Sequence, residues 1–180
     1  KVSMMDYYNN IGDKASVKTI LRELLQSPKA AQTLKLELLR QVIASSQKDN
    51  NPDSTEVLRL FSEALAVPQE NADIYMLKAA YMSFLKLPKP DITRVYEQAI
   101  ETEPDNSSAR IALIQNIWDT HDYDKVIAIC RPAIEYNPDE ILFYYFQGMA
   151  QFHKHDNNAA LETYRKGVGQ IKPDSDPSIV

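Results

Sequence analysis

The sequence predicts an all-α protein, an α-solenoid of about five antiparallel helix pairs. Similar residues recur at a step of 34 residues, which separates Ala99, Ala133 and Gly167 and also separates Pro104 from Pro138. Within each unit, apolar residues recur every three or four positions, the spacing of one helix face. Glycine is scarce, with four residues in 180, and this disfavours sheet folds with many tight turns.

The second helix of each pair carries the clearest signals. The Asp122 carboxylate is placed to accept hydrogen bonds from the free N–H groups that follow it, as a helix N-cap does. The residue before Pro138 is disfavoured in helical geometry, so the helix is expected to end there. The same pattern predicts five second helices, from Asp13 to Pro28, from Asp53 or Ser54 to Pro68, from Asp91 to Pro104, from Asp122 to Pro138 and from Asp156 to Pro173.

The first helices are less regular than the second helices. They are expected near 1–10, 30–46, 72–86, 107–119 and 141–154. In the helix near 72–86 two registers stay open. The packing face holds either Tyr75, Ala79 and Met82 or Met76, Ala80 and Ser83.

The domain organisation follows from these pairs. Residues 1–180 are expected to form one solenoid that is a fragment of a longer protein. The repeats are expected at 1–28, which is partial, and at 29–70, 71–105, 106–139 and 140–174.

Composition excludes several function classes. The net charge of −5 and the pI near 5.2 argue against a protein that coats nucleic acid, because such a protein displaces counterions with an excess of lysine and arginine. No apolar run reaches the roughly 18 residues that span a bilayer, so no direct membrane insertion is expected of this fragment. A single cysteine excludes an internal disulfide and a thiolate zinc cluster. No cofactor is expected, because four dispersed glycines make no phosphate-binding loop.

The residues that invite catalytic or metal chemistry are better explained by structure. His153 and His155 are two residues apart and therefore point to different sides of a helix, whereas a tight metal site needs three or four convergent ligands. His121 and His155 are expected in solvated turns at matching positions. Cys130 falls at a helix-packing position and is expected to be a buried, inert thiol. No catalytic residue and no metal ligand is predicted, so the protein is not expected to be an enzyme.

The units resemble the tetratricopeptide repeat (TPR), a 34-residue helix–turn–helix. In 141–174, five residues match the family's pattern: Tyr144, Gly148, Ala160, Tyr164 and Gly167. In 107–140, Arg110 and Ile114 depart from the pattern, and His121 stands where the family's turn has glycine. The resemblance implies a right-handed superhelix whose first helices line a concave groove and whose second helices form the convex side.

The resemblance also implies that the groove holds an extended peptide or a partner helix. The candidate residues of this partner-binding groove are Phe84, Ile111, Gln115, Asp119, Tyr145, Met149, Phe152 and His153. The lysine, asparagine and arginine set with which some family members grip a C-terminal carboxylate is not found here. An apolar peptide or helix docked on aromatic anchors is therefore expected. Trp118, Tyr144 and Tyr164 are expected to serve packing.

The predicted function is a non-enzymatic protein–protein interaction scaffold, and two alternatives stay open. In the first alternative, the chain is a structural spacer or sensor segment of a larger bacterial envelope or signalling protein. In the second alternative, it is part of an enzyme or ligand-binding module whose active site is completed by flanking regions. A further C-terminal repeat that covers Tyr145, Met149 and Phe152 would remove the proposed groove.

Overall fold

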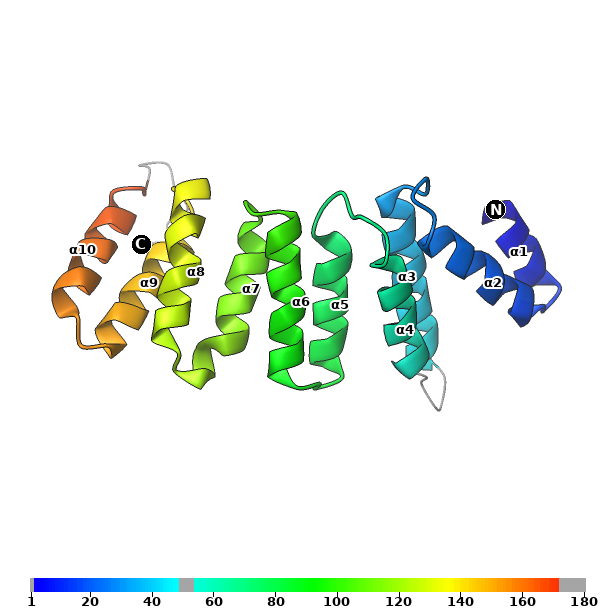
Figure 1. The fold of residues 1–180 in the computed structure, drawn as a ribbon, viewed down its shortest axis with the longest axis horizontal. Coiled ribbons are helices and arrows are strands. Elements are labelled where there is room, and N and C mark those ends of the chain that lie inside the picture. The colour runs from blue at the N-terminus through cyan, green and yellow to red at the C-terminus, as the bar shows by residue number, and fades with distance from the viewer. Residues whose placement is uncertain (1, 49–53, 172–180) are drawn as a thin grey trace. The chain divides into compact units, whose positions relative to one another are not determined.

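The computed structural model describes residues 2–48 and 54–171, and every regular element in these ranges is a helix. The elements are α1 (Val2–Asn10), α2 (Lys14–Leu25), α3 (Gln32–Lys48), α4 (Ser54–Ala64), α5 (Asp73–Phe84), α6 (Lys89–Thr102), α7 (Ser107–Ile117), the 3-10 helix η1 (Trp118–Thr120), α8 (Tyr123–Tyr136), α9 (Ile141–His153) and α10 (Asn157–Val168). Consecutive helices form hairpins, such as α3 with α4 and α9 with α10 (Figure 1). The predicted all-α fold of helix pairs is confirmed. The predicted limit at Asp53 lies outside the described residues. The predicted end of the last helix near Pro173 is wrong, because α10 ends at Val168 and Gly169 caps it.

The chain divides into two compact units, Lys1–Tyr81 and Met82–Val180. In the first unit, α1 packs on α2, α3 on α4, and α2 on α4. The large side chains of Leu25, Leu39, Phe61 and Ile74 are fully buried there. Burying such a side chain stabilises the fold by roughly 1.5–3 kcal/mol, so these residues hold the helices of the unit together.

In the second unit each helix from α6 to α10 packs on the next. Helices α9 and α10 approach each other closely where glycines face aromatic side chains. A Cβ atom added at Gly148 would overlap the Tyr164 ring, and one added at Gly167 would lie 2.7 Å from the Cβ atom of Tyr144. The two glycines therefore let these helices approach closely, as the small residues in the repeat predict.

The second helices begin where acidic residues precede them. The side chains of Asp13, Asp122 and Asp156 each accept a hydrogen bond from the backbone N–H three residues later, at 3.1, 3.0 and 3.2 Å. Each bond satisfies one of the four free N–H groups at a helix start. The acidic N-caps at these three positions are confirmed.

The start of α6 was predicted wrongly. This helix begins at Lys89, two residues before the expected Asp91, and Pro88 is its N-cap without a side-chain hydrogen bond. Pro90 lies in the first turn, where the fixed φ of proline suits a helix. Backbone N–H groups in the first turn have no acceptor within the helix, so the lack of an N–H in proline costs no hydrogen bond there. Asp91 therefore lies inside the first turn, where the helix dipole favours its charge.

The register of α5 is now determined by burial. Ala79 is fully buried and Met82 is buried, whereas Ala80 and Ser83 are exposed. The packing face of this helix is therefore the one that contains Tyr75, Ala79 and Met82.

Four turns between helices contain a residue in the left-handed region. These residues are Gly12, Lys86, His121 and His155, with φ of 75°, 55°, 57° and 62°. His121 and His155 are both exposed and occupy matching turns, as predicted. The backbone needs a positive φ there, which an L-residue adopts at some cost in energy.

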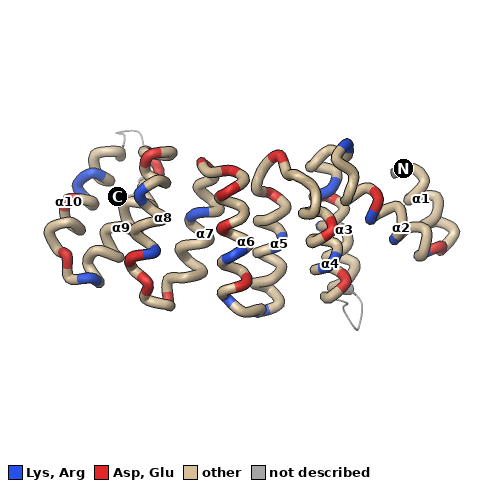
Figure 2. The backbone as a smooth tube through the Cα atoms, in the orientation of Figure 1, with Lys and Arg blue, Asp and Glu red and all other residues tan. Residues whose placement is uncertain are grey.

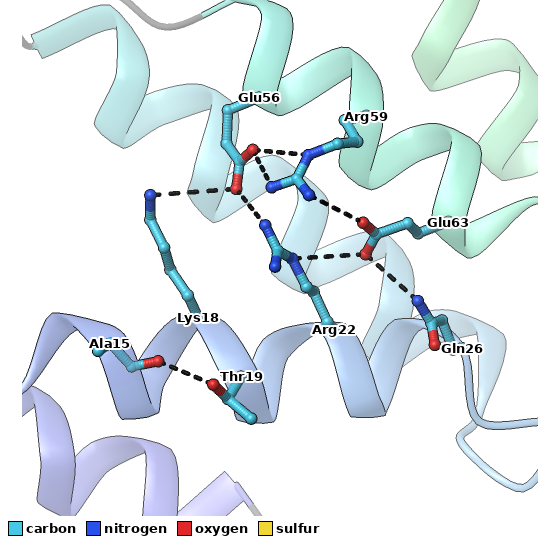
Figure 3. Close-up of polar contacts among 8 residues, drawn as sticks. All are labelled: Ala15, Lys18, Thr19, Arg22, Gln26, Glu56, Arg59 and Glu63. Carbon is cyan, nitrogen blue, oxygen red and sulfur yellow. Dashed lines mark hydrogen bonds and ion pairs between the residues drawn. The ribbon is translucent and has the colours of Figure 1, made fainter.

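An ion-pair network joins the second helices of the first unit (Figure 3). The Arg22 guanidinium on α2 lies 3.0 Å from a Glu56 oxygen and 3.6 Å from a Glu63 oxygen, both on α4. Arg59 pairs with the same two carboxylates from within α4. Glu56 and Glu63 are less than a fifth exposed, so solvent screens these pairs less than ordinary surface pairs. Acidic and basic residues elsewhere are interspersed along the helices (Figure 2).

Candidate partner-binding site

An aromatic hollow of about 310 Å³ lies on the first helices of the second unit. Its lining residues are Gln115 on α7, Trp118 on η1, and Tyr145, Phe146 and Met149 on α9. We refer to these five residues as the aromatic hollow. The polar groups of this lining are the Gln115 amide, the Tyr145 hydroxyl and the Trp118 indole N–H, and the rings and the Met149 side chain make up its apolar part.

The sequence of α9 explains why aromatic side chains are left at the surface. This helix of 13 residues contains no Lys, Arg, Asp or Glu. One face buries Phe143 and Tyr144 against its neighbours. On the other face Leu142 is 43% exposed, Tyr145 is 49% exposed and Phe152 is 55% exposed. Large apolar side chains that gather on one exposed face mark an interaction site more often than scattered ones do.

Ring contacts fix the side chains around the hollow. The Trp118 ring lies 5.8 Å from the Phe146 ring and 6.1 Å from the His153 ring, measured between centroids. His153 stacks on Tyr123 with centroids 4.8 Å apart and an interplanar angle of 5°. Such contacts hold rings in one arrangement, which lowers the entropy lost when a partner binds.

Of the predicted groove residues, Gln115, Tyr145 and Met149 line the hollow. Phe152 and His153 extend the same surface, since their rings are in contact at 6.0 Å and the His153 ring also contacts Trp118.

The remaining three predicted residues do not line the hollow. Ile111 is half-buried on α7, and Phe84 is 64% exposed at the end of α5. The Asp119 carboxylate pairs with the Lys89 ammonium at 2.6 Å. The hydrogen bond from Lys89 lowers the pKa of Asp119, so this carboxylate is ionised and engaged with α6.

Trp118 and Phe146 line the hollow, and Leu142 is exposed on the same helix as Tyr145; these three residues were absent from the predicted set. Trp118 was assigned to packing, and it does pack on neighbouring rings, but it also lines the hollow. Leu142 precedes Tyr145 by three residues, so helical spacing alone would have placed both on one face.

No group of three or more His, Cys, Asp or Glu residues converges within 2–48 and 54–171 in a way that holds a metal ion. Cys130 is fully buried, and burial raises the pKa of its thiol to about 12, with the Arg110 charge opposing the shift. A neutral buried thiol is a poor nucleophile.

None of the helices in the described ranges is both long and apolar enough to cross a membrane.

Comparisons with known proteins show the fold. No protein-family model and no curated protein matches the chain. Among solved structures, MamA matches with a TM-score of 0.60 and 17% identity over 94% of this chain and 93% of that chain. YrrB, described as a TPR protein with an unusual peptide-binding site, matches with a TM-score of 0.56 and 16% identity over 96% of this chain and 84% of that chain. At such identities the similarity shows a shared fold alone.

Proposed function

We propose, because the chain has the tetratricopeptide-like fold, that it is a protein-interaction scaffold and that the exposed face of α7 and α9 binds an apolar peptide or partner helix. The fold carries the coarser part of this proposal. The aromatic hollow carries the finer part, because it provides a concave apolar surface where a partner's side chain loses contact with water.

The exposure of Tyr145 and Phe152 is the observation on which the binding surface rests. Each aromatic side chain that a partner covers removes a large apolar area from water, which contributes roughly 25 cal/mol per Å². Aromatic residues clustered around a hollow dominate the affinity of many interfaces. The two residues lie seven positions apart on α9, two helical turns, so they contact a partner at two points along its length.

The chemistry of the lining defines the partner. Among the described residues that line the hollow there is no Lys or Arg, so a terminal carboxylate finds no cation to pair with in this lining. Gln115 offers one amide that donates to and accepts from a peptide backbone. An amphipathic helix or an extended segment with two or three apolar side chains fits this surface. The similarity in fold to YrrB, a TPR protein with a peptide-binding site, supports a peptide as the ligand class.

The proposal is tested by an array of peptides with apolar residues at helical or alternating spacing, followed by titration of the selected peptide. Trp118 is the only tryptophan of the chain and lines the hollow, so its emission reports binding there. Tyr145→Ala combined with Met149→Ala is expected to weaken binding at least tenfold without loss of helicity.

The matched control combines Leu161→Ala with Val168→Ala on α10. These side chains are 50% and 66% exposed and lie outside the aromatic hollow. The control variant is expected to bind as the unmodified protein does. Equal binding by the Tyr145 and Met149 variant would remove this surface as the partner site.

A further inference from the structure

A second hollow, of about 330 Å³, lies in the first unit and is lined by residues of α1, α2, α3 and α4. Most of its surface is apolar. Met5, Leu21, Leu38 and Leu60 contribute side chains that are at least nine-tenths buried. The hollow is partly open to solvent, so a small molecule can enter it from the surface.

One polar atom inside this hollow has no partner. Ser46 lines it and is only 9% exposed, and its Oγ atom forms no hydrogen bond with any described residue. A buried hydroxyl without a hydrogen bond is unfavourable, because it has lost its bonds to water without replacing them.

The charges near the hollow are already paired. Glu56 lines it and binds Arg22 and Arg59, and the Lys18 ammonium lies 4.0 Å from the Glu56 carboxylate. These ion pairs leave Glu56 neutralised, so an ionised ligand gains little from this side (Figure 3).

We propose that this hollow binds an uncharged small molecule with an apolar body of one or two rings and a single hydroxyl or carbonyl group. The apolar body contacts Met5, Leu21 and Leu38, and the polar group forms a hydrogen bond with Ser46 Oγ after the serine side chain rotates about its Cα–Cβ bond toward the hollow. An apolar cavity of about 150 Å³ is enough for one benzene molecule, so the larger volume here accommodates a two-ring compound. Ligand pockets begin at about 300 Å³. The site lies in the other unit from the aromatic hollow, and it is independent of the proposed peptide binding.

The test uses the full chain labelled with [methyl-13C]methionine and titrated with 2-naphthol, with naphthalene as the probe that lacks the hydroxyl. Met5 is the only one of the five methionines among the residues that line this hollow. A saturable shift of the Met5 methyl signal is expected with 2-naphthol. Ser46→Ala is expected to weaken 2-naphthol by about three- to tenfold and to leave naphthalene unchanged.

A second pair of variants tests the location. Val42 is half-buried and lines the hollow, so Val42→Trp is expected to fill it and abolish binding of both probes. Ala44→Trp adds the same side chain at an exposed position of the same helix, outside the lining, and is expected to bind normally. Absence of a saturable Met5 shift, or an equal effect of Ser46→Ala on both probes, overturns the proposal. If Val42→Trp lowers helicity, the comparison of 2-naphthol with naphthalene on the Ser46→Ala variant decides whether the hollow is the binding site.

Discussion

Tyr144 donates a hydrogen bond from its hydroxyl group to the carbonyl oxygen of Pro138 at 2.9 Å. Thirty-four residues earlier, Arg110 donates from Nε and Nη2 to the carbonyl oxygen of Pro104 at 3.0 and 2.8 Å. The arginine therefore forms the same contact in one repeat as the tyrosine does in the next. Its aliphatic stem replaces the packing of the ring.

The first prediction concerns Arg110. Its side chain is 6% exposed and also donates to the carbonyl oxygen of Ile129. We expect Arg110→Ala to lower the free energy of unfolding by about 2–4 kcal/mol, because the part-buried hydrogen bonds to Pro104 and Ile129 and the packing of the buried side chain are both lost. Arg110→Tyr is expected to lose less, since a tyrosine hydroxyl can still reach Pro104. Urea unfolding followed by circular dichroism measures both, and equal losses would refute the replacement argument.

The second prediction concerns the close approach of α9 and α10. Gly167→Ala is expected to lower the free energy of unfolding by about 1–3 kcal/mol, because the added methyl group would lie 2.7 Å from the Cβ atom of Tyr144. Gly169→Ala is the control, since this exposed residue has a φ of −64° that any residue adopts. A thermal melt in which both variants behave alike would contradict the packing of these helices.

The third prediction concerns the left-handed turn before α10. His155 is exposed and has a φ of 62°, so His155→Gly is expected to raise the free energy of unfolding by about 0.5–1 kcal/mol. Gly12→Ala makes the opposite substitution, from glycine to a residue with a Cβ atom, at a turn with a φ of 75°. This variant is expected to be less stable than the unmodified protein. Lower stability of His155→Gly would show that the histidine side chain makes a contact worth more than the backbone strain.

The fourth prediction concerns Cys130. Burial raises the pKa of its thiol from 9.0 to about 12, so the unfolded chain ionises first as the pH rises. The stabilisation that this difference provides is complete below pH 9 and is lost as the pH rises from 9 to 12. We expect a thiol reagent at about pH 8 to label the folded protein far more slowly than the protein in denaturant.

A control variant distinguishes the contribution of the Cys130 thiol to the pH dependence of stability from that of the tyrosine and lysine side chains, which titrate in the same pH range. Cys130→Ala is expected to lose less stability than the unmodified protein between pH 9 and 12. Identical pH dependence of unfolding in the two proteins would show that the thiol is not shielded from water.

Local signals explain how much of the fold could be predicted. Asp122 and Asp156 act as N-caps through bonds to the nearby backbone, so residues close in sequence were enough to place α8 and α10. The start of α6 was mispredicted because Asp91 was interpreted as an N-cap like Asp122 and Asp156. Pro88 and Pro90 favour the helix start that the structure shows at Lys89.

The binding surfaces were harder to predict, because they depend on how helices pack. The sequence placed Tyr145 and Met149 on one face of a helix, and the hollow forms only where Trp118 from η1 meets them. In the first unit, Met5 and Leu38 have the spacing of ordinary core residues. That a hollow remains between them depends on distances among four helices, which no short-range pattern encodes.

Methionine NMR of the peptide complex tests the central claim most directly, since only Met149 among the five methionines lines the aromatic hollow. With the peptide selected on the array, the Met149 methyl signal is expected to shift saturably, with the same Kd as Trp118 emission, while Met4 and Met5 on α1 stay unchanged. A peptide that binds with its largest shifts at Met4 or Met5, and with Met149 unmoved, would contradict binding on α7 and α9.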